Sequence, residues 1–229
     1  MIASVPAGIE TGAQWAATAL AVTLLPAGLA LCTCFPRMLV TLGILRQGLG
    51  LGSVPGGLVM TGLAAALTFA SMGPTLDAAW HGGLASLAAG NSRDPAASLR
   101  GAETPLRTFM FEQLERSGGG GTLATVLRAK GQAIDPAAPP SRRDIDTMTL
   151  LPAYALNELR VACMLGFKLL LPFLAIDLAV AATLASLGMF MTPPTLVSLP
   201  LKLMLFVAVD GWALVSSGLV TGVTGGTVP

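Results

Sequence analysis

Charge is distributed so unevenly along these 229 residues that it limits what the chain can fold into. Of the 25 acidic and basic residues, 18 lie between Asp77 and Arg160, and the other 145 positions hold only seven. In all, 11% of the residues are charged and 53% are hydrophobic, whereas ordinary soluble domains have about 25% charged residues. A soluble fold of this size leaves much of its surface in water and cannot hide so much uncharged chain. We therefore expect a membrane protein or part of a membrane-like assembly.

Four apolar runs are each long enough to cross a bilayer as a helix, which takes about 20 residues. Two of them contain no charge and two contain one lysine and one aspartate each; they cover residues 12–35, 47–76, 161–187 and 195–223. We predict an all-α integral membrane or assembly protein with two long helical hairpins, four hydrophobic helices in all, separated by a polar and partly helical segment. The expected divisions are residues 1–80, 81–149 and 150–229.

Two arginines suggest how the first hairpin is oriented. Arg37 and Arg46 flank the first short connection, whereas the last connection, residues 188–194, has no charge. Cytoplasmic loops carry an excess of Lys and Arg, so we predict that Arg37 and Arg46 are cytoplasmic-side anchors. Both termini and the middle segment would then face the other side of the membrane. Because no basic stretch precedes the first apolar run, we expect a retained helix and not a signal peptide.

The middle segment is predicted to contain one or two amphipathic helices. Thr104 and Pro105 form a helix-start signal, an N-cap followed by proline at the first helical position. A shorter helix is expected over residues 123–130. The first helix has an apolar stripe, formed by Leu106, Phe109, Met110 and Leu114. Because such helices cannot bury their stripes alone, we expect them to dock on a partner or another subunit.

Little in the sequence supports catalysis or nucleic-acid binding. The single histidine, His81, cannot provide a histidine pair for a metal, and no serine or cysteine has a recognisable nucleophile setting. The alternating glycines at 48, 50 and 52 lack the third glycine of a dinucleotide-binding loop. The net charge of +1 gives no surface for a polyphosphate. We therefore expect no enzyme activity, no cofactor, no metal site and no nucleic-acid partner.

Charged residues inside the last two apolar runs are candidate functional residues, because an ionisable group within a span is costly. Lys168 and Asp177 are half a revolution out of phase on one helix and cannot pair there. If the chain reverses near Thr192, Asp177 and Lys202 lie about 7–8 Å apart along the axis, within reach of a lysine. We predict an Asp177–Lys202 pair, within or between subunits, and expect Asp210 to need a donor from elsewhere. Polar contacts for assembly or gating are the favoured role, and a proton relay is the alternative.

The turn between these two runs combines methionines with prolines. Met189, Phe190 and Met191 precede Thr192 and a pair of prolines that ends the helix. Methionine is flexible and fills irregular gaps. An ordinary apolar turn would explain the segment, but a ring of such turns would make a deformable constriction.

Short motifs along the chain, in a fixed order, resemble those of a known family. The second half contains Pro-Ala-Tyr at 152–154, Asn-Glu-Leu-Arg at 157–160, Gly-Met-Phe-Met at 188–191, Leu-Pro-Leu-Lys at 199–202 and Val-Asp-Gly-Trp at 209–212, and the middle segment contains Pro-Leu-Arg at 105–107. This pattern is similar to that of the FliP family, the flagellar type III export-gate proteins, over nearly the whole chain. The injectisome homologue SctR shares most of it, but the Pro-Ala-Tyr and Pro-Leu-Arg forms are more like the flagellar branch.

The resemblance implies a subunit of the flagellar export gate, in the bacterial inner membrane and the flagellar basal body, with the middle segment on the periplasmic side. It implies a pentameric ring with FliQ-like and FliR-like subunits that conducts unfolded flagellar proteins together with FlhA-like and FlhB-like proteins. The family's methionine-rich turn serves as a pore gasket, which assigns that role to Met189, Phe190 and Met191. Phe190 replaces the usual middle methionine, and Lys168 stands where an apolar residue is usual. The alternatives are an injectisome gate subunit and a small-molecule or proton transporter.

Overall fold

The computed structural model describes residues 28, 30–52, 54–88, 94–131 and 141–225. These residues form helices and no strand, so the all-α prediction is confirmed for this part of the chain. The first apolar run, residues 12–35, lies almost entirely outside the described residues. The helices are α2 (Phe35–Leu49), α3 (Gly57–Ala79) with a π-helical turn (Trp80–Leu84), α4 (Ala85–Ala88), α5 (Pro95–Arg116), α6 (Gly120–Ala129), α7 (Thr147–Ser186), α8 (Pro194–Ala208) and α9 (Gly211–Thr224).

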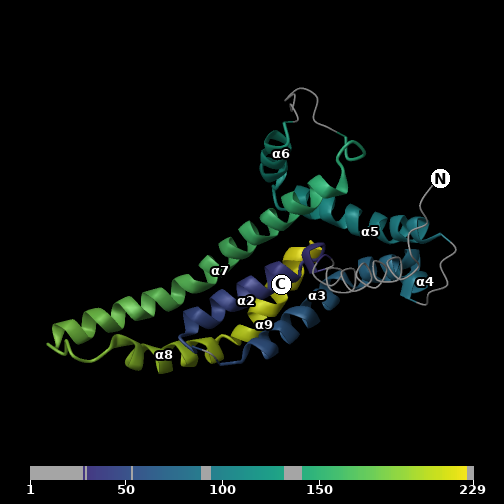
Figure 1. Ribbon diagram of the computed structural model, residues 1–229. Helices are drawn as coiled ribbons and strands as arrows, with labels where there is room; N and C mark the ends of the chain where they lie inside the picture. The colour runs from purple at the N-terminus through teal and green to yellow at the C-terminus, as the bar shows by residue number, and fades with distance from the viewer. Residues whose placement is uncertain (1–27, 29, 53, 89–93, 132–140, 226–229) are drawn as a thin grey trace, which may run out of the picture.

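The molecule is elongated, with a two-helix arm at one end (Figure 1). The 40 residues of α7 extend over roughly 60 Å, and α8 runs back along the outer part of α7. The helices α2, α3 and α9 lie together beside the inner part of α7, and α5 and α6 stand at the end opposite the arm tip. The buried core is built mainly from α2, α3, α5, α7 and α9.

The predicted turn between Arg37 and Arg46 is wrong, because both residues belong to α2. Pro36 occupies the first turn of this helix, where the missing N–H would have had no helical partner. The helix ends at Gly50, whose φ of 75° is in the left-handed region that glycine adopts readily. The connection to α3 is therefore residues 50–56, and the two arginines lie at opposite ends of one helix.

The predicted start of the middle helix at Thr104 is also wrong. Helix α5 begins at Pro95, where the side chain of Asp94 accepts a hydrogen bond from the backbone N–H of Ala97 at 3.2 Å. Asp94 and Pro95 thus form the same kind of helix-start signal as Thr104 and Pro105, but earlier in the chain. Within the helix, the hydroxyl of Thr104 donates to the carbonyl of Arg100 and does not cap a terminus.

The apolar stripe of α5 is buried as predicted, but against helices of the same chain. Leu106, Phe109, Met110 and Leu114 are all at most 7% exposed, and α5 packs against α3 and α7. Phe109 contacts Tyr154 of α7 edge to face, with ring centroids 6.3 Å apart. The stripe therefore needs no second subunit to cover it, contrary to the expectation from sequence. Helix α6 ends beside Gly131, whose φ is 75°, close to the predicted end of the shorter helix.

The fourth apolar run is not one continuous helix. It divides into α8 and α9, whose axes differ in direction by 64°. Asp210 at the break has φ 48° and ψ 53°, a left-handed conformation that costs a residue other than glycine free energy. Gly211 follows, and a Cβ atom there would lie 2.2 Å from the ring of Phe206. The break therefore depends on an Asp-Gly pair, a combination typical of turns.

Among the described residues, two helical stretches are long and apolar enough to cross a membrane, residues 57–88 and Thr147–Ser186, and the bent pair α8 and α9 would be a third. The second predicted hairpin is present in part, since α7 and α8 are antiparallel neighbours joined by residues 187–193. In the first hairpin, only the second helix of the predicted pair falls among the described residues. Two or three candidate spans are thus found among the described residues, which include three of the four predicted runs; the run at 12–35 lies mostly outside them.

Candidate functional site

An ion pair joins the two helices of the arm. Lys202 Nζ lies 2.6 Å from Asp177 Oδ2 and also donates a hydrogen bond to the carbonyl oxygen of Gly48 at 2.9 Å. The Lys202 side chain is 7% exposed and that of Asp177 is 36% exposed. The predicted pairing of Asp177 with Lys202 is confirmed, and it forms within one chain. Through these two contacts, Lys202 holds α8 against both α7 and α2.

Glycines allow α2 and α7 to approach closely next to this pair. A Cβ atom on Gly48 would lie 2.7 Å from Leu170 Cδ1, and one on Gly166 would lie 2.4 Å from Ile44 Cδ1 and 3.0 Å from Ile44 Cβ. Atoms at such distances overlap, so a larger residue at position 48 would displace the Leu170 side chain and one at position 166 would displace Ile44. The glycine at 48 also belongs to the alternating series noted in the sequence, and its role here is packing.

The predicted gasket residues lie at the tip of the arm. Met189, Phe190 and Met191 lie in the middle of the connection between α7 and α8, after Gly188, whose φ is 75°. Phe190 is 81% exposed and Met191 is 97% exposed. Met189 is 46% exposed, so the described part of the chain covers about half of this side chain and leaves Phe190 and Met191 largely uncovered at the end of the arm. Their position at the tip of the arm is compatible with the predicted gasket role.

A second ion pair, buried in the core, was not predicted from the sequence. Arg37 Nη2 on α2 lies 2.6 Å from Glu158 Oε1 on α7, and the two side chains are 2% and 0% exposed. Because it is buried, Arg37 cannot reach a lipid headgroup, so its predicted role as a cytoplasmic-side anchor is wrong. The sequence offered two signals: Arg37 lies in a stretch with few charges, and the Asn-Glu-Leu-Arg motif contains one acid, Glu158. Because the two residues are 121 positions apart, the sequence did not indicate that they pair.

Polar side chains around this pair bind the end of α9. Arg37 Nη1 donates to the carbonyl of Gly222 at 3.2 Å, and Gln113 Nε2 of α5 donates to the carbonyl of Val223 at 2.6 Å. Arg116 donates to the same Val223 carbonyl. The last carbonyls of a helix have no partner within it, and cationic donors suit its negative end. Three side chains from α2 and α5 therefore hold the C-terminal turn of α9 in the core.

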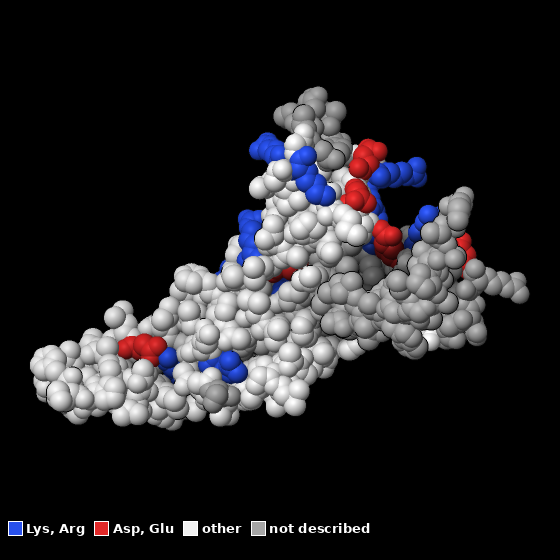
Figure 2. Space-filling view, in the orientation of Figure 1, with Lys and Arg blue, Asp and Glu red and all other residues white. Residues whose placement is uncertain are grey.

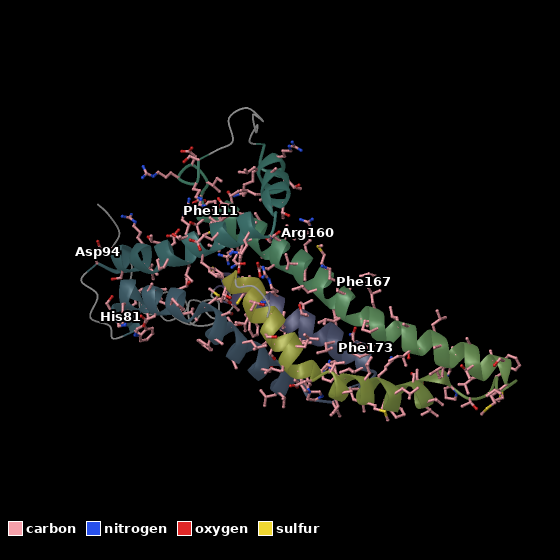
Figure 3. The ribbon with its side chains drawn as sticks, turned by 180° about the vertical axis from the view of Figure 1, so that it is seen from behind. His81, Asp94, Phe111, Arg160, Phe167 and Phe173 are labelled. Atoms are coloured by element: carbon pink, nitrogen blue, oxygen red, sulfur yellow. The ribbon has the colours of Figure 1, made fainter. Side chains whose placement is uncertain are left out.

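A stacked arrangement of arginines fixes the segment before α7. The guanidinium groups of Arg107 and Arg142 lie 5.4 and 5.7 Å from the ring centroid of Phe111 (labelled in Figure 3), distances typical of cation–π contacts. Arg107 also donates to the carbonyls of Arg142 and Ile145. Arg142 forms two hydrogen bonds with the carboxylate of Glu115, which raise the pKa of the Arg142 guanidinium above its ordinary value. The Pro-Leu-Arg motif thus has a structural role at the start of α7.

The remaining predicted charges do not enter these clusters. Lys168 and Asp210 are exposed, and neither forms an ion pair with a described residue. Arg46 is half-buried and donates to the carbonyl of Pro55 at 3.2 Å, so it stays at the connection between α2 and α3. The space-filling view shows charged side chains gathered over α5 and α6, whereas the arm carries only a few (Figure 2).

Metal-ligating side chains are scattered in the part of the chain that the structure describes. His81 Nε2 lies 3.4 Å from Asp77 Oδ1 on the same exposed helix face, and no group of three or more His, Cys, Asp or Glu residues in that part could hold a metal ion. The described cysteines are all free. The chemistry of the sites is therefore that of buried ion pairs, helix-end contacts and apolar surface.

This fold and these sites define an all-helical membrane protein whose charges hold its own helices together and whose apolar arm is left exposed. The model of the FliP family matches residues 19–219. The chain belongs to the FliP family.

Similar proteins from several bacteria carry the name flagellar biosynthetic protein FliP. The protein from Agrobacterium fabrum is 38% identical over 195 residues, which is 85% of this chain and 77% of that protein. The protein from Pectobacterium carotovorum is 40% identical over 197 residues, or 86% and 73% of the two chains. The protein from Bacillus subtilis is 39% identical over 196 residues, or 85% and 84%.

Proposed function

We propose that this chain is a subunit of the flagellar type III protein export gate in the bacterial inner membrane. The observation that carries the proposal is the family match over residues 19–219, supported by relatives that are named flagellar biosynthetic proteins. The apolar helices support a place in or next to the membrane. The function is therefore to help conduct unfolded flagellar proteins across that membrane.

The gate is an oligomeric ring of this chain with FliQ-like and FliR-like subunits. Exposed apolar surface supports this assembly, because soluble or isolated proteins rarely leave large patches uncovered. On the arm, Leu178 of α7 and Leu196 and Met204 of α8 are each more than two-thirds exposed. In a ring, neighbouring subunits cover these side chains, and the arm tips meet around the pore.

At the pore, Met189, Phe190 and Met191 form the gasket. Their exposure at the tip of the arm supports this role, and the flexibility of methionine allows an apolar constriction to close around chains of different shape. Phe190 has fewer rotatable bonds, so it stiffens the centre of the constriction. Asp177 and Lys202 hold the two helices that carry the tip.

The middle segment faces the periplasm in this proposal. Arg46 alone supports this orientation, because Arg37 is buried and Arg46 lies beside the connection between α2 and α3. By the positive-inside rule, the end with Arg46 faces the cytoplasm.

Deletion of the gene in its own bacterium tests the function. The deletion strain should secrete no hook or filament protein and should not swim, and a plasmid copy should restore both. If the bacterium also has an injectisome, secretion of its effectors should continue. Loss of effector secretion with normal flagella would assign the chain to the injectisome, and normal secretion by both systems would overturn the gate proposal.

A further inference from the structure

An apolar groove lies between the inner arm and the break that separates α8 from α9. Its volume is about 380 Å³, within the range of about 300–1,000 Å³ typical of small-molecule sites. Its lining residues come from four helices and include Leu45 of α2, Phe173 of α7, Phe206 of α8 and Leu214 of α9. Phe173 points from α7 toward these helices, whereas Phe167 projects away from them (Figure 3). The groove is thus built by four helices and has hydrocarbon walls.

Lys168 is the one charged residue among the described residues that line this groove. It is exposed and has no ion-pair partner among the described residues, unlike Lys202, which is buried against Asp177. Asp210 stands between two lining residues, Val209 and Gly211, but is not itself part of the lining. An unpaired lysine on a helix apolar enough to cross a membrane needs an anion, since an unpaired charge is costly there.

We propose that the groove binds one anionic phospholipid, with an acyl chain against the apolar walls and the phosphate on the ammonium group of Lys168. Two features of the groove favour this occupant: its apolar walls suit a hydrocarbon chain, and Lys168 suits a negatively charged headgroup. Basic pockets between membrane helices are suited to anionic headgroups for the same reason. The inference rests on the membrane location within the proposed function, but not on export itself.

The binding is tested on the full chain, purified from its own bacterium with the subunits that accompany it. The complex is exchanged into detergent micelles that contain phosphatidylglycerol and phosphatidylcholine together in equal amounts. Mass spectrometry then measures how much of each lipid the complex retains. The wild type should retain phosphatidylglycerol in preference. Lys168→Gln should lower that retention about five-fold, the effect of one lysine on an anionic lipid, and Lys168→Arg should preserve it.

Two further variants separate the site from general effects. Arg160→Gln removes an exposed cation on the same helix that does not line the groove, and should retain lipid like the wild type. Leu214→Trp fills the groove without changing charge, and should lower retention of the lipid. The proposal is overturned if the wild type prefers neither lipid or if Lys168→Gln matches the wild type. A cross-link from position 168 to a second copy of the chain, with lipid excluded, would also overturn it. None of these results would change the outcome of the gene-deletion assay, which tests the export function separately.

Discussion

Arg37 on α2 and Glu158 on α7 are 121 positions apart in the sequence, yet they form a buried ion pair of 2.6 Å. The same arginine binds the end of α9, and Gln113 of α5 connects Arg37 with Val223. Four helices thus meet at one pair of opposite charges. Because both charges are desolvated, such a pair stabilises the fold little more than two apolar residues would. Removal of one partner alone, however, leaves the other as an unpaired buried charge.

Removal of Arg37 alone should therefore be strongly destabilising. For Arg37→Gln we expect a loss of about 3–5 kcal/mol, seen as a large fall in the thermal unfolding midpoint of the detergent-purified protein. The double variant Arg37→Met with Glu158→Leu should recover most of the loss, because it removes both charges. Arg142→Ala, which breaks the exposed pair with Glu115, is the matched control and should cost less than about 1 kcal/mol. Equal effects of Arg37→Gln and Arg142→Ala would contradict this account.

The pair in the arm should matter for assembly or export. Asp177→Ala leaves the buried ammonium of Lys202 with only the carbonyl of Gly48, so the arm should lose its fixed geometry. We expect reduced yield of the assembled complex and reduced secretion of flagellar proteins. Asp177→Asn keeps a hydrogen-bond acceptor and should be milder. Wild-type secretion and complex yield for Asp177→Ala would show that the pair is dispensable.

Close packing of α2 on α7 should not tolerate a methyl group at position 166. In Gly166→Ala the new Cβ atom meets both Cδ1 and Cβ of Ile44, and overpacking of this kind costs about 1–3 kcal/mol. Gly43→Ala is the control, because a Cβ atom at that position of α2 has no neighbour within 4 Å. Thermal unfolding should place Gly43→Ala at or above the wild type and Gly166→Ala below it. The reverse order would be incompatible with the helix contact described.

The gasket role predicts a leak. Replacing Met189 and Met191 with serine should let small ions pass through the gate while export continues, because the apolar seal is lost and the passage remains. Conductance or ion-sensitive growth measures the leak, and secreted flagellin measures export. Leu196→Ser, an exposed position on α8 beyond the tip, should not leak. A double methionine variant that stays tight to ions would exclude the gasket.

Local patterns predicted the features that depend on neighbouring residues. The stripe from Leu106 to Leu114 follows the helical period and is buried, and the Asp177–Lys202 pair follows from the turn near Thr192. The break at Asp210 escaped the prediction, although the Asp-Gly pair there is a turn signal. Its apolar neighbours on both sides made one long span the simpler interpretation.

Contacts between distant segments could not be predicted from the same patterns. Arg37 stands next to a proline, which fits a turn as well as a helix start, and only its burial against Glu158 decides between them. The start of α5 shows the same ambiguity, since Asp94 before Pro95 and Thr104 before Pro105 are equivalent signals locally. Packing against α3 and α7, which is a property of the whole fold, favours the longer helix.

A photo-activated cross-linking residue at position 191 tests whether the arm tips surround the exported chain, in cells that export a flagellar protein fused to a tightly folded plug. The plug stalls the chain in the gate, so a covalent adduct between position 191 and the stalled protein is expected. The same residue at Met148, which is 74% exposed at the other end of α7, should give much less. Adducts at Met148 and none at Met191, with the substrate stalled in both strains, would contradict a gate formed by the arm tips.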